Sequence, residues 1–198
     1  ENRYQKMRAM KAVFIAAAII LSAAPYDAFA EANGGAIGSF MNIGAGTRAL
    51  GMGGAYAAVS EDASAAYWNP ACLSLIQRNE ASAMHALLFE GFQYDYIGLA
   101  YPTLDYADWG AAWIRMGSPE IEERDEFNVP TGDAFSVSAN ALLLSASYPV
   151  ASGVSIGHTV KAVLKEGSNA NFSTDAGAYY YPFDEIRAGI NMKNVTVE

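Results

Sequence analysis

Cysteine is almost absent from this sequence, since Cys72 is the only one in 198 residues. A disulfide framework and a cysteine metal cluster are therefore excluded. Basic residues are also few, with 12 Lys and Arg against 21 Asp and Glu, so no nucleic-acid partner is expected. Charged residues are only 17% and hydrophobic residues 52%, which excludes a disordered tail. After residue 31 no run of about 18 uncharged apolar residues occurs, so a helical membrane protein is not expected.

Residues 1–30 have the pattern of a secretory signal peptide preceded by a few upstream residues. Met7, Arg8 and Lys11 form a basic start, and an uncharged apolar core of residues 12–24 follows. Ala28-Phe29-Ala30 then supplies a small-residue cleavage site. The apolar core is too short to span a bilayer, which needs about 20 residues. We therefore expect an exported chain that begins after residue 30.

The rest of the chain has two parts of different composition. Residues 31–79 are rich in Gly and Ala, whereas residues 80–198 alternate apolar and polar side chains between turn signals. Three Tyr-Pro pairs, beginning at residues 101, 148 and 181, each end an apolar run, as proline does at strand ends. Short turns follow these pairs, whereas the connection 117–133 is long, an asymmetry typical of outer-membrane barrels. The pattern predicts these strands: 80–90, 92–101, 108–116, 134–148, 153–166, 171–181 and 185–194.

The faces and lengths of the strands favour a membrane barrel over a soluble antiparallel sandwich. In 153–166, one face is apolar and includes Ile156 and Val160, which we expect to contact lipid. The other face includes Thr159 and Lys161, which we expect in a wet lumen. These runs reach the roughly 9 to 11 residues of a tilted transmembrane strand and exceed the usual 5 to 6 of a soluble one.

The strand 134–148 alternates less regularly than the others. Ser138 and Asn140 share their parity with Leu142 and Leu144. Either a bulge shifts the phase here or part of the lumen is apolar.

The predicted fold class is all-β, a transmembrane antiparallel β-barrel of which this chain is an N-terminal excerpt. About seven strands cannot close a bacterial barrel, because single-chain bacterial barrels have even strand numbers and lipid-facing edges would be unsatisfied. The sequence also starts without Met and stops without a terminal strand that ends in an aromatic residue. We therefore expect about half of a barrel in residues 80–198.

The Gly- and Ala-rich part contains the most specific motifs. One runs from Arg48 to Gly54 (RALGMGG), and a second runs from Asp62 (DAS) to Trp68-Asn69-Pro70-Ala71. With these motifs the chain resembles the PorV/PorQ family of outer-membrane proteins, within the group related to the FadL fatty-acid transporter. Cys72 stands where that family usually has Gly. Strand motifs around Gly157, Gly177 and Gly189 extend the resemblance over most of residues 38–194.

The resemblance implies a barrel of about fourteen strands, inside the range known for outer-membrane proteins. It also implies that residues 31–79 form a hatch or plug in the lumen. The hatch residues that the motifs mark are Arg48, Gly51, Gly53, Gly54, Asp62, Trp68, Asn69, Pro70 and Ala71. The hatch around Asn69-Pro70-Ala71 either gates passage or only stabilises the barrel.

For function, the FadL-like relatives imply transport of hydrophobic compounds across the cell outer membrane of a Gram-negative envelope. The PorV branch implies instead a type IX secretion component that binds secreted protein cargo at the cell surface. A soluble exported sandwich that binds a ligand is the third possibility. The expected partners are outer-membrane lipid and either hydrophobic small molecules or secreted cargo.

No enzyme, cofactor or metal site is expected. His85 and His158 lie far apart in sequence without companion ligands. Many Ser residues are present, but no nucleophile elbow accompanies them. The connection 117–133 has six acidic residues and only Arg124 as a base. It is expected to be a solvated loop, and its alternative is a surface site for divalent cations or a basic partner.

One contact is predicted in detail. Lys161 and Asp175 fall on the polar faces of neighbouring strands, and we expect them to be directly opposite each other in the lumen. The same register pairs Leu164 with Phe172 and makes residues 167–169 a three-residue turn. An opposite-charge pair in this position contributes roughly 0.2 to 1 kcal/mol.

Overall fold

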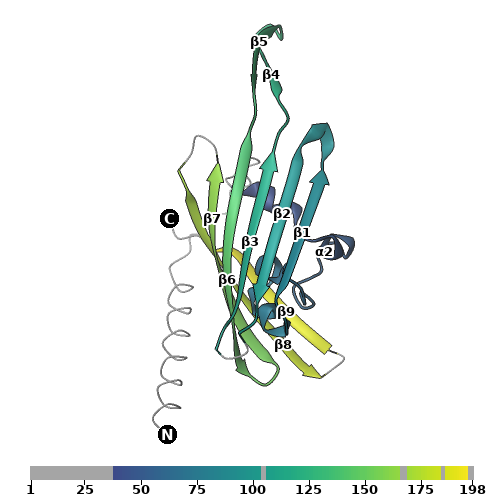
Figure 1. The fold of residues 1–198 in the computed structure, drawn as a ribbon, viewed down its shortest axis with the longest axis vertical. Helices are drawn as coiled ribbons and strands as arrows, with labels where there is room; N and C mark the ends of the chain where they lie inside the picture. Colours follow the sequence, from purple (N-terminus) through teal and green to yellow (C-terminus); the bar gives the residue numbers. More distant parts are fainter. Residues whose placement is uncertain (1–37, 104–105, 166–168, 184–185, 196–198) are drawn as a thin grey trace.

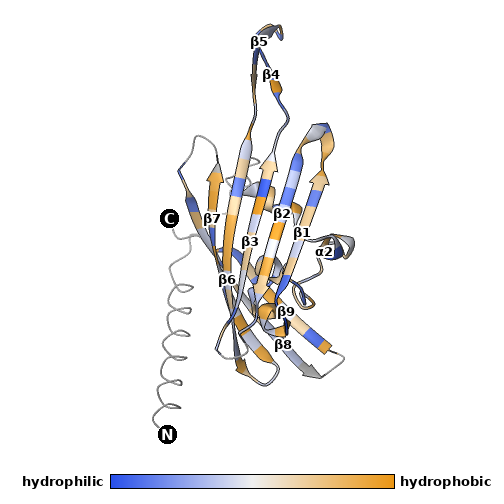
Figure 2. Cartoon of the chain, viewed as in Figure 1, coloured by the Kyte–Doolittle hydropathy of each residue, from blue (hydrophilic) through white to orange (hydrophobic). Residues whose placement is uncertain are grey.

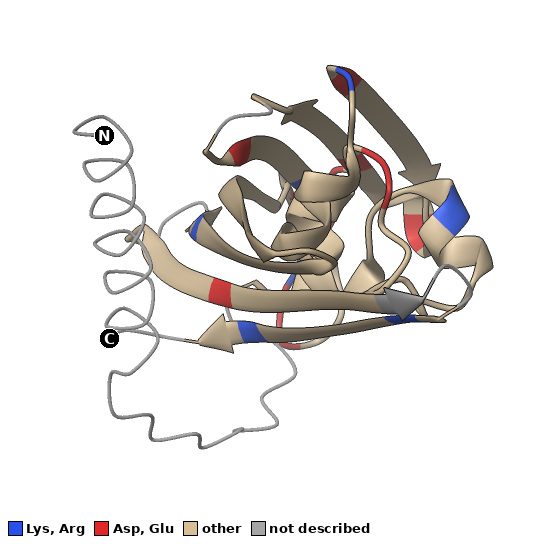
Figure 3. Ribbon diagram, turned by 90° about the horizontal axis from the view of Figure 1, so that it is seen from below, with Lys and Arg blue, Asp and Glu red and all other residues tan. Residues whose placement is uncertain are grey.

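The main feature of the computed structural model is one seven-stranded antiparallel sheet that curves around the N-terminal part of the chain (Figures 1 and 3). The structure describes residues 38–103, 106–165, 169–183 and 186–195, so the expected signal peptide lies outside the described residues. The strand order is β1-β2-β3-β6-β7-β8-β9, a meander of neighbours interrupted only by a separate β4-β5 pair. The all-β class is confirmed.

The seven main strands lie close to the predicted runs. They are β1 (Glu80–Leu87), β2 (Gln93–Tyr101), β3 (Asp108–Gly117), β6 (Ser138–Ala151), β7 (Val154–Lys165), β8 (Asn171–Phe183) and β9 (Ile186–Val195). Residues 38–79 contain the short helices η1 (Ser39–Ile43), α2 (Thr47–Gly51), α3 (Ala65–Trp68) and η2 (Pro70–Leu75), and η3 (Phe89–Gly91) joins β1 to β2. No described helix has the length and apolarity needed to cross a membrane.

The connection after β3 is a hairpin and not the loop that the sequence predicted. β4 (Ile121–Arg124) and β5 (Pro130–Phe135) pair antiparallel and project beyond the main sheet (Figure 1). Asp125 holds the turn, because its side chain accepts hydrogen bonds from the backbone N–H groups of Phe127 and Val129 at 2.9 and 2.8 Å. The expected strand 134–148 was therefore wrong at its start, since residues 134 and 135 belong to the hairpin.

Side chains alternate between the two faces of the main sheet. On β7, Ser155, Thr159 and Lys161 are buried on the concave face, whereas Val160 and Leu164 are exposed on the convex face. Apolar residues recur along the strands in Figure 2. Large apolar side chains exposed on the convex face are Ile97, Leu99, Trp109, Leu142, Leu144, Phe172, Tyr180, Ile190 and Met192. The predicted separation of an apolar face from a polar face is confirmed on β7 and β9, whereas the buried residues of β2 and β3 on the concave face are mainly apolar.

The irregular run in β6 has a simple explanation. Pairing with β3 and β7 is continuous from Asn140 to Ser147, so no bulge shifts the phase there. Leu142 and Leu144 point outward, while Ala141 and Leu143 are buried on the concave face. Part of the concave face is therefore apolar.

Candidate functional site

The hatch segment, described from residue 38 to residue 79, packs on the concave face of the sheet. Its helices α3 and η2 contact β3, β6, β7 and β8. Two apolar clusters form there. The first joins Phe40, Met41, Ala45, Ala66 and Tyr67 to Met84, Tyr94, Tyr96, Ala112, Ile114, Ala141, Leu143 and Val163. The second joins Ala63, Ala65, Ala71, Cys72, Leu73 and Ile76 to Ala100 and Tyr179.

Asn69 fixes the turn at the centre of the hatch. It precedes Pro70, which favours an extended backbone, and it caps η2 by accepting the backbone N–H of Ala71 at 3.1 Å. Its Nδ2 donates to the carbonyls of Ala57 at 2.7 Å and Ala178 at 3.1 Å. Asn69 is fully buried. One amide thus joins two parts of the hatch to β8.

Glycines on three neighbouring strands allow the hatch backbone to approach the sheet closely. A Cβ at Gly157 would lie closer than 3.0 Å to the backbone N of Ala71 and the carbonyl C of Pro70. A Cβ at Gly177 would lie equally close to Asn69 Oδ1, and one at Gly189 would meet the Ala57 backbone. Real Cβ atoms essentially never come so near. The sequence marked these glycines only as strand motifs and gave no sign of what they contact.

Hydroxyl groups on the strands satisfy carbonyls of the hatch. Ser145 donates to the carbonyl of Ala66 at 3.1 Å, and Ser147 donates to the carbonyl of Ala71 at 2.9 Å. Thr159 is fully buried and lies 2.8 Å from Ser145. Buried carbonyls need such partners. The expectation of a wet lumen at Thr159 is therefore wrong, because the hatch covers this residue.

Asp62 holds the turn that precedes α3 through three hydrogen bonds. Its carboxylate accepts hydrogen bonds from the Ser64 backbone N–H at 2.8 Å, from Ser64 Oγ at 2.5 Å and from the Tyr56 hydroxyl at 2.7 Å. Burial alone raises the pKa of Asp62, but these hydrogen bonds and the charge of Arg48 outweigh it and lower the pKa. Burial and the same carboxylate raise the pKa of Tyr56. Asp62 therefore remains ionised and holds the turn.

The Arg48–Gly54 motif is held more loosely than the Asn69-Pro70-Ala71 turn. Arg48 lies over the Tyr56 ring at 5.6 Å, and its charge acts on Asp62. Leu50 and Met52 are 39% and 44% exposed. Gly53 and Gly54 have positive φ angles of 63° and 79°, which glycine adopts without strain. A Cβ at Gly51 or Gly53 would meet no atom within 4 Å.

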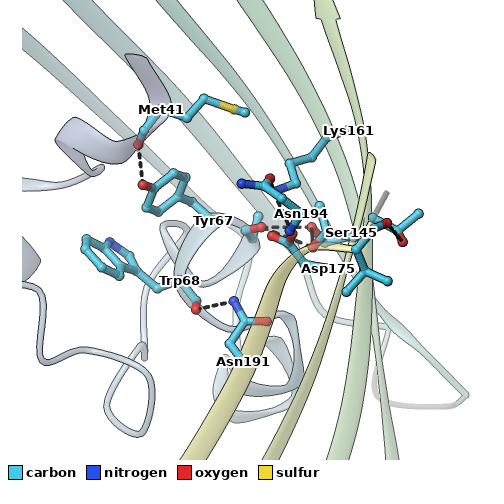
Figure 4. Close-up of polar contacts among 12 residues, drawn as sticks. Met41, Tyr67, Trp68, Ser145, Lys161, Asp175, Asn191 and Asn194 are labelled. Carbon is cyan, nitrogen blue, oxygen red and sulfur yellow. Dashed lines mark hydrogen bonds and ion pairs between the residues drawn. The ribbon is translucent and has the colours of Figure 1, made fainter. Parts of the chain in front are cut away.

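Trp68 is the aromatic centre of the hatch. Its Nε1 donates to the carbonyl of Ala45 at 2.6 Å, and its ring meets the edge of the Tyr67 ring with centroids 5.0 Å apart. The Tyr67 hydroxyl donates to the carbonyl of Met41 (Figure 4). Lys193 Nζ on β9 lies 3.8 Å from the Tyr67 ring centroid and 4.8 Å from the Trp68 ring centroid.

β9 adds two further polar contacts to the hatch. Asn191 donates to the Trp68 carbonyl at 2.7 Å, and Arg187 forms an ion pair with Glu61. With Lys193, these residues share one parity of β9. The alternation of apolar and polar residues in this strand signalled the shared face, but not the partners.

Lys161 and Asp175 form a buried ion pair, with Nζ 2.6 Å from Oδ1 (Figure 4). Their side chains are only 4% and 1% exposed. Asn194, which has a positive φ of 56°, accepts from Lys161 at 2.7 Å and donates its backbone N–H to Asp175 at 2.8 Å. This network joins three strands at an irregularity in the β8-β9 pairing.

The predicted register of this pair was wrong by two residues. Thr159 is opposite Asp175, and Lys161 is opposite Ser173, so the ion pair is diagonal. Phe172 accordingly pairs with Ala162 and not with Leu164. The predicted turn at residues 167–169 lies mostly outside the described residues. The long Lys side chain reaches a carboxylate one step along the same face, and pattern alone does not distinguish the two registers.

Within the described ranges, no group of three or more His, Cys, Asp or Glu side chains is placed to hold a metal ion. Cys72 is buried, and burial raises the pKa of its thiol to about 12. It packs in an apolar cluster beside Leu73.

The fold is an antiparallel sheet that curves around the short helices of residues 38–79. The chain belongs to the uncharacterised protein family UPF0164, whose model matches residues 16–178. No curated protein and no solved structure matches it.

Proposed function

We propose that this chain is part of an outer-membrane β-barrel that transports hydrophobic compounds past an N-terminal hatch. The observation that carries the proposal is the polarity of the sheet. Leu99 and Leu144 are 52% and 56% exposed on the convex face, while Lys161, Asp175 and Ser145 are buried on the concave face. Lipid solvates such an outer face, whereas water does not.

A soluble sandwich accounts less well for this arrangement. A sandwich buries one face of each sheet against a second sheet and leaves the other face polar. Here short helices cover the concave face, and the convex face is the apolar one. The sheet edges at β1 and β9 also lack neighbours among the described strands, and a membrane sheet requires closure by further strands.

The apolar part of the concave face supports hydrophobic small molecules as the transported compounds. Toward the β4-β5 end it is apolar, with Tyr94, Ile114 and Leu143 buried there and Met116 partly exposed. Toward the Tyr-Pro turns it carries hydroxyls and glycines instead. The hatch covers these residues, so hydrophobic compounds would reach them only when part of the hatch moves away, and the resemblance to FadL-like transporters supports this direction.

The hatch contacts indicate which part could move. The Asn69-Pro70-Ala71 turn lies against strand backbone at Gly157 and Gly177, so its displacement would break several buried hydrogen bonds. The Arg48–Gly54 stretch has exposed apolar side chains at Leu50 and Met52, and a Cβ at Gly51 or Gly53 would meet no atom within 4 Å. We therefore propose that the Asn69-Pro70-Ala71 turn anchors the hatch to the sheet and that compounds pass at the Arg48–Gly54 stretch.

The second candidate is a secretion component that binds protein cargo. The β4-β5 hairpin favours it, because the hairpin projects from the sheet and its Phe127 is 78% exposed. An isolated two-stranded hairpin is marginally stable in water, so a protein bound at its tip would stabilise it.

Uptake measurements distinguish the two candidates. The full-length protein is reconstituted in phospholipid vesicles and tested with radiolabelled oleate as the probe. If the protein transports oleate, uptake should exceed that of empty vesicles. This uptake should be lost when Leu50 and Met52 are both replaced by Asp. The matched control replaces Phe127 with Ser, which should leave uptake unchanged. No uptake, together with missing extracellular proteins in cells that lack the gene, would favour secretion.

A further inference from the structure

We infer that the convex face contacts the bilayer over a band with two defined limits, a charged row on β1 to β3 and an aromatic row near the Tyr-Pro turns. The inference rests on the proposed outer-membrane location. It goes further by fixing the depth of each strand in the bilayer and the side on which the lumen is apolar.

The charged row crosses three strands along one line of register partners. His85 is the register partner of Asp95, and Asp95 is the partner of Arg115. His85 Nδ1 lies 2.6 Å from Asp95 Oδ1, and Arg115 lies 3.5 Å from Asp95 Oδ2. The row continues to Asn140 on β6, which accepts a hydrogen bond from Trp113 Nε1 at 3.2 Å.

Charges on a lipid-facing surface need a reason for their position. On the described parts of the seven main strands, the acidic, basic and histidine side chains on the convex parity are His85, Asp95 and Arg115 on β1 to β3, and His158 on β7 near the aromatic row. A Lys or Arg at the bilayer midplane costs about 2 to 4 kcal/mol, but the cost falls to about 0 to 1 near the interface. Three such groups on neighbouring strands therefore mark the membrane–water interface.

The opposite limit is aromatic. Tyr101 and Trp109 are register partners at the ends of β2 and β3. On β6, Tyr148 stacks on His158 with ring centroids 5.9 Å apart. Tyr180 on β8 is 49% exposed. Tyr and Trp have an apolar body and a polar tip, which suits the headgroup level.

The spacing of the two limits is somewhat below the apolar thickness of an outer-membrane barrel. Asn140 and Tyr148 are eight residues apart on β6, and Asp95 and Tyr101 are six apart on β2, or about 27 and about 20 Å along the strands at about 3.4 Å per residue. A tilt of about 40° reduces these lengths to about 21 and about 16 Å of thickness, compared with the roughly 25 Å apolar band of outer-membrane barrels. Leu142 and Leu144 are the large apolar residues of this strand that are exposed between the two limits.

The limits also place the hatch and the hairpin. β3 ends at Gly117 and β6 begins at Ser138, just beyond the charged row, so the β4-β5 hairpin extends into water on that side. Gly157, which contacts the hatch turn, pairs with Ser147, next to Tyr148. The hatch turn is therefore anchored at the aromatic limit, and the apolar part of the concave face lies toward the hairpin side.

Spin-label accessibility tests these depths. Cys72→Ala removes the only cysteine of the sequence, and single cysteines are then placed at His85, Leu144 and Phe127 in the full-length protein. Labelled protein in vesicles of phosphatidylethanolamine and phosphatidylglycerol is measured by power saturation with oxygen and with a water-soluble nickel chelate. Leu99→Cys on β2 is a second position between the limits, and gel mobility before and after heating checks that each variant is folded.

The expected ratio of oxygen to nickel accessibility is severalfold higher at Leu144 and Leu99 than at Phe127, with His85 between them. If His85 is as deep as Leu144, the limit is wrong but the membrane location stands. If Leu144 is exposed to the nickel reagent, the proposed function fails as well. If neither reagent reaches Leu144, protein covers the convex face, and the inference is overturned.

Discussion

Replacing Gly157 by Ala should destabilise the protein, although the same change in an uncovered strand should stabilise it. Gly157 does not have a left-handed φ, so its backbone conformation accepts Ala. Gly in a strand is less stable than Ala by roughly 0.5 to 1 kcal/mol. At this site, however, the new Cβ would lie within 3.0 Å of backbone atoms of Pro70 and Ala71, which cannot rotate away. Overpacking of this kind costs typically about 1 to 3 kcal/mol.

The expected net effect of Gly157→Ala is a loss of about 1 to 3 kcal/mol, because steric overlap outweighs the backbone gain. Urea unfolding of the full-length protein in lipid vesicles measures it, and limited proteolysis reports separately on release of the hatch. Gly51→Ala is the matched control, since its Cβ would meet nothing within 4 Å, and it should be neutral or slightly stabilising. A neutral or stabilising Gly157→Ala would refute the close approach of hatch and sheet.

Three further predictions concern charge. Lys161→Met should cost about 3 to 5 kcal/mol because it leaves the Asp175 carboxylate buried without its partner, whereas Lys161→Met with Asp175→Leu should cost less; urea unfolding compares the two. If lipid covers the convex face, Val160→Arg should destabilise the protein by about 2 to 4 kcal/mol in the same unfolding assay in vesicles. A change within about 0.5 kcal/mol would place this residue in water. Because folding lowers the pKa of Asp62, the ionised carboxylate stabilises the protein above the unfolded-state pKa, and this stabilisation is lost as pH falls through the folded-state pKa. Below about pH 4, the stability of the wild-type protein should therefore fall more than that of Asp62→Asn. Parallel pH profiles of the two proteins would contradict this prediction.

The sequence was sufficient for the strands and for their faces, because alternation with a period of two is read directly from residues such as those of β7. The hairpin β4-β5 was missed because its side chains are exposed on both faces and lack the alternation of a half-buried strand. Its signal was Asp125 before Asn128, a pair of turn-forming residues inside the acidic stretch.

The hatch contacts could be predicted only in part. The motifs around Asp62 and Asn69 marked the residues that hold the turn, but not that Asn69 contacts β8 at Ala178. The burial of Thr159 depends on the hatch lying above it, which no pattern within β7 contains. Likewise, the diagonal Lys161–Asp175 pair depends on a register that two-residue periodicity leaves open.

The central claim is that lipid covers the convex face of the sheet, and fractionation of cells that express the full-length protein tests it most directly. The account predicts that the protein sediments with outer membranes, resists alkaline carbonate extraction, and changes its gel mobility only after heating, because a closed barrel withstands detergent. Recovery from the periplasm without detergent, with the same gel mobility before and after heating, would contradict the claim.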